Sequence, residues 1–229
     1  SDPEAAIRLH NRMRAHVPLL LALSGNSPYW QGRNTGLASA RTPLFQAFPR
    51  VGIPRAFASY AHYVETVDLL LRCGAFPEPT FLWWDVRPQP RLGTVEVRIM
   101  DAQTTGTQSA TLVALVASIA HLELEVGYHP EKLIDAPELL AENRFLAARD
   151  GMQARLLDPI AARPLPATQL LERLLEAVRP HAADLGCADG LEPLAALASE
   201  TGAARQLRIV GDDERLDHLV AYISDAFTE

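Results

Sequence analysis

Glu96 and Arg98 lie two residues apart in a segment, residues 94–100, where apolar and polar side chains alternate. This alternation predicts a two-faced strand with both charged groups on one face and Asp101 at its end. Carboxylate oxygens suit Mg²⁺ and guanidinium groups suit phosphoryl oxygens, so the pair could hold a metal ion and a phosphate. The same spacing fits a salt-bridged pair on the solvent face of an antiparallel sheet, and spacing alone favours that interpretation.

The preceding segment, residues 81–88, shifts the balance toward a functional site. It is aromatic and β-branched and ends at Pro88, and Pro90 and Gly93 then make a short connection to the next strand. We therefore predict a β-hairpin near residues 81–101. It concentrates five charged groups in an otherwise apolar region: Asp85, Arg87, Glu96, Arg98 and Asp101.

Helices must position this hairpin, because the rest of the chain has mostly helical periodicity. The hairpin is the one β element that we predict, which gives an α+β fold in a single domain, residues 1–229, with a sub-boundary near an extended break at 159–166. An isolated two-stranded hairpin is marginal in water, so it requires more strands from elsewhere. The predicted helices cover residues 3–24, 38–48, 59–72, 107–127, 136–148, 168–179, 182–185, 191–201 and 213–227.

Composition excludes several classes of protein. The 229 residues are 48% hydrophobic, enough for a substantial core, and the net charge of -7 without a basic run argues against nucleic acid and anionic membranes as partners. No apolar run approaches the roughly 20 residues of a membrane span. Cys73 and Cys187 are far apart and lack a CxxC pattern, so a reducing cytoplasm is the expected location.

Five segments in a fixed order resemble one enzyme family over nearly the whole chain. The segments that carry the resemblance are Asn-Ser-Pro-Tyr-Trp-Gln-Gly (26–32), Gly-Leu-Ala-Ser-Ala-Arg (36–41), Trp-Asp-Val-Arg-Pro (84–88), Thr-Val-Glu-Val-Arg-Ile-Met-Asp (94–101) and Glu-Asn-Arg-Phe-Leu-Ala-Ala-Arg-Asp-Gly (142–151). With these segments in this order, the sequence is similar to the bacterial carboxylate–amine ligases of the glutamate–cysteine ligase 2 type.

This resemblance implies a fold and a reaction. The fold would be the C-terminal part of a glutamine-synthetase-like antiparallel sheet, and the reaction would be ATP-dependent amide formation. A carboxylate, typically the γ-carboxylate of glutamate, would attack the γ-phosphate of ATP, and an amine such as that of cysteine would displace phosphate from the acyl phosphate. ATP and Mg²⁺ are thus the implied cofactors, in a pathway like glutathione biosynthesis.

The resemblance also implies residue roles. Glu96 would be a Mg²⁺ ligand, Arg98 would hold the γ-phosphate, and Arg87 would line the nucleotide or phosphate side. Arg41 would bind the carboxylate of the amino-acid substrate. The substrate pocket would be shaped by Asn26, Tyr29 and Trp30.

The resemblance implies a long N-terminal portion with several acidic metal ligands, which would precede the first residue of this sequence. We therefore expect the C-terminal part of a ligase that is inactive alone and needs the missing portion, a companion chain or a homo-oligomer. A non-catalytic helical module that binds a partner through unpaired strands is the alternative. A third possibility is a relic that holds nucleotide without chemistry.

Overall fold

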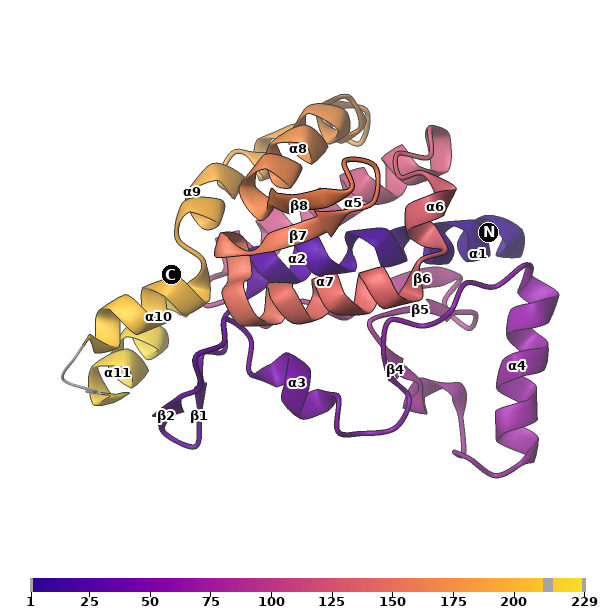
Figure 1. Cartoon of the computed structure of the whole chain (residues 1–229), viewed down its shortest axis with the longest axis horizontal. Coiled ribbons are helices and arrows are strands. Elements are labelled where there is room, and N and C mark those ends of the chain that lie inside the picture. Colours follow the sequence, from indigo (N-terminus) through magenta and orange to yellow (C-terminus); the bar gives the residue numbers. More distant parts are fainter. Residues whose placement is uncertain (1, 212–215, 228–229) are drawn as a thin grey trace.

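The computed structural model describes residues 2–211 and 216–227, and the chain begins there with two helices in series (Figure 1). The Asp2 carboxylate caps α1 (Pro3–Met13) by accepting a hydrogen bond from the amide of Glu4 at 2.9 Å. A 3-10 turn, η1 (Arg14–His16), separates α1 from α2 (Val17–Ser24). The predicted helix over 3–24 is thus interrupted just before Pro18, which lies in the first turn of α2, where proline is tolerated.

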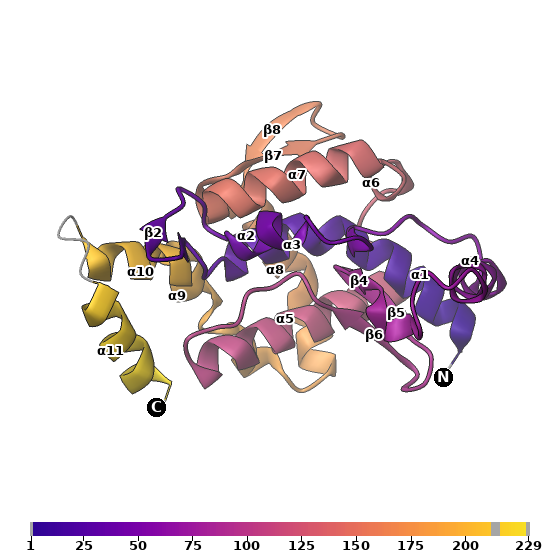
Figure 2. The same ribbon diagram turned by 90° about the horizontal axis from the view of Figure 1, so that it is seen from below.

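The other helices pack around or beyond α2, whose eight residues are all buried. Figure 2 shows α7 packed along α2, while α5 packs along α8 on the other side of the core. The further helices are α3 (Arg41–Phe45), α4 (Tyr60–Arg72), α5 (Gly106–Glu125), α6 (Glu131–Ile134), α7 (Pro137–Asp150), α8 (Ala167–Asp184), α9 (Leu194–Ser199), α10 (Gly202–Val210) and α11 (Leu216–Ala226), with 3-10 turns η2 (Pro79–Phe81), η3 (Gly151–Gln153) and η4 (Ala188–Leu191).

The β structure consists of short pairs, so the fold is α+β as predicted, but the expectation of a single β element is wrong. Four two-stranded sheets occur within the described residues, of which β3–β4 is parallel and the others are antiparallel. The strands are β1 (Tyr29–Trp30), β2 (Arg33–Asn34), β3 (Val51–Gly52), β4 (Trp83–Trp84), β5 (Val86–Gln89), β6 (Thr94–Val97), β7 (Arg155–Asp158) and β8 (Arg163–Pro166).

The predicted central hairpin exists but is shorter than residues 81–101. It comprises β5 and β6, and its register places Arg87 opposite Glu96. β4 does not belong to it, because Trp83 and Trp84 pair with β3 instead. The hairpin rests on α1.

Other segments also differ from the prediction, including α6, which was not predicted. Residues 159–166, expected as an extended break, form the turn and second strand of the β7–β8 hairpin, whose prolines Pro164 and Pro166 are tolerated because each strand is an edge. α8 continues through Pro180 to Asp184 instead of splitting in two. The helix α10 was not predicted at all; it begins after Thr201, whose hydroxyl accepts from the amide of Ala204.

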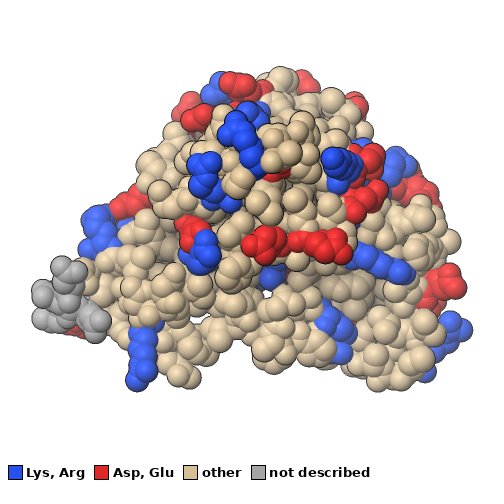
Figure 3. Space-filling model, viewed as in Figure 1, with Lys and Arg blue, Asp and Glu red and all other residues tan. Residues whose placement is uncertain are grey.

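The main core lies between α2, α5, α7 and α8, with η3 and β7 closing it. Among the helices of residues 2–211 and 216–227, α5 alone is long and apolar enough to cross a membrane, which corrects the expectation that no segment would qualify. In this structure 44% of that apolar window is buried inside the protein. Figure 3 shows acidic and basic side chains interspersed on one face, with acidic groups over α7.

Candidate functional site

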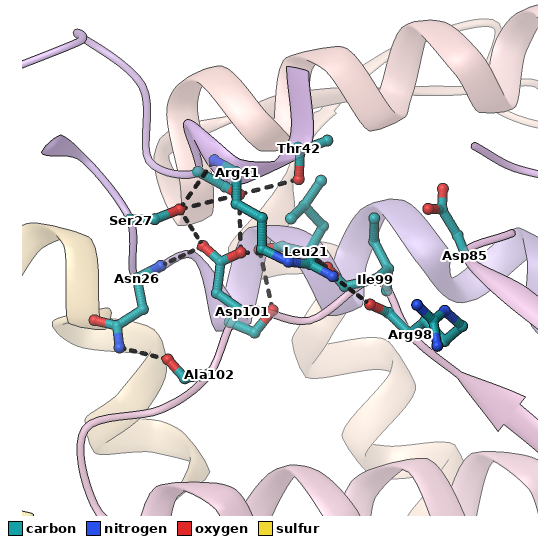
Figure 4. Close-up of polar contacts among 12 residues, drawn as sticks. Leu21, Asn26, Ser27, Arg41, Thr42, Asp85, Arg98, Ile99, Asp101 and Ala102 are labelled. Atoms are coloured by element: carbon teal, nitrogen blue, oxygen red, sulfur yellow. Dashed lines mark hydrogen bonds and ion pairs between the residues drawn. The ribbon is translucent and has the colours of Figure 1, made fainter. Parts of the chain in front are cut away.

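Asp101 is the centre of a buried hydrogen-bond network that joins three segments of the chain (Figure 4). The side chain is 3% exposed and accepts from the Asn26 amide at 2.9 Å and the Ser27 hydroxyl at 2.7 Å. Its other oxygen accepts from the hydroxyl of Ser39 at 3.1 Å, and that hydroxyl also contacts Thr42. A carboxylate with several donors fixes the geometry around it. Asp101 therefore anchors the loop before α3 to the segment that follows β6.

Arg41 ties the same loop to the backbone of that segment. Its two terminal nitrogens donate to the carbonyl oxygens of Arg98 and Ile99, each at 3.0 Å, and one lies 3.6 Å from the Asp101 carboxylate. The side chain is 38% exposed. Arg41 thus helps to set the position of the Arg98 backbone. Its implied role in binding the carboxylate of the amino-acid substrate stays a prediction.

Of the five charged groups predicted to gather on the hairpin, Arg87, Glu96 and Arg98 form a cluster, whereas Asp85 and Asp101 bond to other partners. One Glu96 carboxylate oxygen accepts from the Arg87 Nε at 2.7 Å and from the Gln89 amide at 2.8 Å, and the other accepts from an Arg98 Nη at 2.9 Å. Partial burial raises the pKa of Glu96, but the hydrogen bonds from Gln89, Arg87 and Arg98 outweigh it and lower that pKa to about 2. The carboxylate is therefore ionised and fully engaged at neutral pH.

One buried hydrogen-bond donor of Arg98 has no partner among the described residues. Its Nε is buried and has no acceptor among the described residues, and the side chain as a whole is partly exposed. Buried donors are nearly always paired, so an unpaired guanidinium nitrogen is a ready position for an anionic oxygen. Arg87 lacks this freedom, because its Nη1 donates to the carbonyl oxygens of Thr80 and Leu82 at 2.7 and 2.8 Å.

A buried ion pair lies behind the cluster, between Asp85 and Arg144 of α7. The Arg144 Nε donates to Asp85 at 2.6 Å and an Nη donates to its second oxygen at 3.3 Å. Burial raises the pKa of Asp85 even though Arg144 opposes the rise. The Asp85 carbonyl also accepts from the Arg98 amide at 2.7 Å, which continues the ladder beyond β6. The pair therefore joins α7 to Asp85, whose backbone holds Arg98 just beyond the end of β6.

The three residues assigned to a substrate pocket lie apart from this cluster. Asn26 belongs to the Asp101 network, where its side-chain amide donates to the Ala102 carbonyl at 2.7 Å and its Oδ1 accepts from Gln206 at 2.8 Å. Tyr29 and Trp30 are on β1, and Figures 1 and 2 place the β1–β2 hairpin across α3 from β5–β6. Tyr29 borders a cavity of about 380 Å³ beside α10, and Trp30 is 52% exposed. Their roles stay predictions.

The donor set suits an anion better than a bare metal ion. Glu96 is the carboxylate that bridges two arginines, while Asp85 and Asp101 are each held by other partners. In the described part of the chain, neither group of converging histidine and carboxylate ligands includes Glu96. Mg²⁺ binds through one or two carboxylates plus substrate phosphates and water, so these residues fit it once further oxygen ligands are supplied.

The sequence reading missed the organising role of Asp101 and its hydroxyl partners. Ser27 and Ser39 both lie in segments that carried the family resemblance, which was the available signal. Nothing in their spacing indicates that they meet, since the contact depends on how the loop folds back between Ser24 and α3.

The pKa of Glu96 gives a pH dependence of stability. A depressed carboxyl pKa contributes stability above the ordinary value near 4.5, and this contribution is lost as the pH falls toward about 2. We expect Glu96→Gln to lower the free energy of unfolding at pH 7 by more than at pH 3. Urea unfolding of both proteins at the two pH values measures this difference, which isolates Glu96 from other titrating groups. An equal cost at both pH values would contradict the assignment.

Comparison with known proteins identifies the family of the chain. Residues 1–221 match the model of "Glutamate-cysteine ligase family 2". A Rubrobacter xylanophilus protein named "Putative glutamate--cysteine ligase 2-1" is 41% identical over 222 residues, which is 96% of this chain and 59% of that protein. Proteins named "Putative glutamate--cysteine ligase 2" from Gloeobacter violaceus and Sorangium cellulosum are 36% and 38% identical, over 96% and 91% of this chain and 60% and 56% of their own lengths. The chain spans about 60% of these relatives, and it belongs to glutamate–cysteine ligase family 2.

Proposed function

We propose that this chain carries the phosphate-binding arginines of an ATP-dependent carboxylate–amine ligase. The family membership supports ligase chemistry in general. The observation that carries the proposal is the Arg98 side chain, which is held by Glu96 and by the Arg41-bound backbone yet keeps a buried Nε without a partner in the described residues. By the names of the relatives, the substrates would be glutamate and cysteine, with other carboxylates or amines open.

In the proposed reaction, a substrate carboxylate oxygen attacks the γ-phosphorus of ATP and ADP leaves. The amine nitrogen then attacks the carbonyl carbon of the acyl phosphate, phosphate leaves, and the nitrogen loses a proton. Little covalent work falls to the protein, because phosphoryl transfer depends on positioning and on charge stabilisation. Arg98 supplies positive charge to the transferring phosphoryl group. Mg²⁺, when bound, would neutralise phosphate charge.

The surrounding residues hold Arg98 in place for this role. Glu96 accepts from both Arg98 and Arg87, so the two guanidinium groups stay together despite their like charge. Arg41 fixes the carbonyl oxygens of Arg98 and Ile99, and Asp101 fixes the loop from which Arg41 comes. Such a preorganised arrangement costs no rearrangement when charge develops.

We further propose that the catalytic site is completed by polypeptide beyond these 229 residues. β5–β6 is a two-stranded sheet in the described structure, and Glu96 alone does not make a metal site. A glutamine-synthetase-like antiparallel sheet would supply more strands and more carboxylates. On this proposal the chain is cytoplasmic and does not turn over ATP by itself.

Trapping of the acyl phosphate tests the ligase proposal. Hydroxylamine is an amine that converts an acyl phosphate to a hydroxamate, which is detected by colour with iron(III). The chain would be incubated with ATP, Mg²⁺ and glutamate, alone and mixed with the part of the Rubrobacter xylanophilus relative that lies outside the match. We expect ATP-dependent hydroxamate only in the mixture. Hydroxamate from the chain alone would overturn the proposal that its catalytic site is incomplete. If the two polypeptides form a complex and neither sample gives hydroxamate, the ligase proposal is overturned.

A binding module that pairs through its strands is the second candidate. The edges of β5–β6 have no further strand partner in residues 2–211 and 216–227, and such edges invite pairing. Complex formation in the mixture without hydroxamate favours this candidate.

A further inference from the structure

Two histidines and an aspartate converge between α5 and the end of α8, on a part of the molecule that the ligase proposal does not use. The Nδ1 atoms of His121 and His181 lie 2.8 Å apart. A carboxylate oxygen of Asp184, one turn after His181, completes a group whose ligand atoms all lie within 4.8 Å of one another. Both histidines are partly buried and Asp184 is exposed, so the group is open to solvent.

The two Nδ1 atoms face each other at hydrogen-bond distance. In a hydrogen bond between two Nδ1 atoms, one Nδ1 carries a proton and the other does not. When that proton moves to the Nε2 of the same ring, both Nδ1 atoms are free to coordinate a metal ion. Zinc–nitrogen bonds of about 2.0–2.1 Å place two nitrogens of a tetrahedral ion about 3.3 Å apart. The rings need to separate by only about 0.5 Å to reach that spacing.

The local charge also favours a cation. Asp184 is the last residue of α8, where the helix dipole is negative, and the structure shows no ion pair or hydrogen bond of its side chain to another described residue. Nitrogen-rich ligand sets select zinc-like ions over Mg²⁺.

A second cluster of similar composition does not suit a cation. The Glu123 carboxylate accepts from His16 at 2.6 Å, from the Tyr128 amide at 3.0 Å and from Arg12 at 3.3 Å. The fixed positive charge of Arg12 and the filled acceptor positions oppose a metal ion there, although His129 also lies close by. This buried cluster serves to join α1 to the end of α5.

We propose that His121, His181 and Asp184 form a binding site for a divalent transition-metal ion such as Zn²⁺, which joins α5 to the C-terminal end of α8. Three protein ligands leave one tetrahedral position for water. The ion adds a link between two helices whose contact forms a large part of the core. The site is independent of the ligase proposal, and its test requires no catalytic activity.

Metal titration of the untagged, metal-free protein tests the site. We expect equilibrium dialysis to show one Zn²⁺ bound per chain. Co²⁺ in its place should give the visible absorbance of a tetrahedral complex, and Zn²⁺ should raise the Tm by mass action. His181→Ala should weaken binding by more than about 100-fold, because losing a residue that only supports a ligand already costs roughly 10–100-fold. Asp184→Asn should also weaken it, and this exposed position is suitable even where a histidine variant does not fold.

His218→Ala is the matched control, since His218 is an exposed histidine on α11 outside the cluster. It should bind Zn²⁺ as the unmodified protein does. The proposal is overturned when the unmodified protein binds no Zn²⁺, or when binding survives both His181→Ala and Asp184→Asn. The proposal is also overturned when His129→Ala loses Zn²⁺ binding and the other variants keep it, because that result places the ion in the buried cluster around Glu123.

Discussion

Replacement of Arg144 by methionine is expected to lower the free energy of unfolding by about 3–5 kcal/mol, the usual cost of removing one partner of a buried ion pair. Methionine keeps most of the apolar length of the side chain, so the loss arises mainly from the uncompensated Asp85 carboxylate. That carboxylate is buried and takes two hydrogen bonds from Arg144. Urea unfolding followed by circular dichroism measures the change.

Arg149→Met provides the control on the same helix. Arg149 pairs with its neighbour Asp150 and its side chain is 46% exposed, so solvent takes over when the pair is lost. We expect no measurable change in stability for this variant. The double variant Asp85→Asn, Arg144→Met should recover part of the loss because no buried charge remains. Equal effects of Arg144→Met and Arg149→Met would show that the buried pair has no special role.

Replacement of Arg98 by alanine is expected to lower turnover of the assembled ligase by about 100- to 1000-fold, the range found when one transition-state donor is removed. Arg98→Lys should restore charge without the planar fork and recover only part of the rate. The measurement is ATP-dependent hydroxamate formation at saturating substrate, which reports kcat.

Arg91→Ala is the matched control, because Arg91 is an exposed arginine in the turn of the β5–β6 hairpin. It should leave kcat unchanged. Thermal unfolding of each variant separates lost chemistry from lost structure. A rate for Arg98→Ala within about threefold of the unmodified enzyme would remove Arg98 from the proposed role, since one donor is worth far more than that.

The local patterns of the sequence predicted most helices and the hairpin. The alternation over residues 94–100 correctly placed Glu96 beside Arg98, because a strand brings alternate side chains to one face. The boundaries were less accurate. Trp83 and Trp84 have strand propensity, yet nothing local shows that they pair with Val51 and Gly52, some 30 residues earlier.

The prolines show where single-residue rules failed. The predicted helices stop at 179 and begin again at 182, but α8 continues through Pro180 with Val178 and Ala182 buried, so packing offsets the lost hydrogen bond. The prediction of an extended break at 159–166 overlooks that edge strands accept prolines such as Pro164 and Pro166.

The candidate site was predicted as residues but not as contacts. The substrate role of Arg41 stays a prediction, and the structure adds its two hydrogen bonds to backbone carbonyl oxygens, which were not predicted. Such a contact depends on how residues 25–40 fold back onto the segment after β6. Sequence separation of more than 50 residues hides it from any local pattern.

The convergence of Ser27, Ser39 and the Asn26 amide on one buried carboxylate constrains how this protein can evolve. A mutation of Asp101 alone leaves these donors buried without an acceptor, at about 1–3 kcal/mol for each unsatisfied group, and a mutation of one serine removes only a part of the network. Replacement of all partners by apolar groups of similar shape can be nearly neutral. Single substitutions between the polar network and an apolar replacement therefore pass through less stable proteins. We expect relatives that lack the polar network to differ at positions 27, 39 and 101 together.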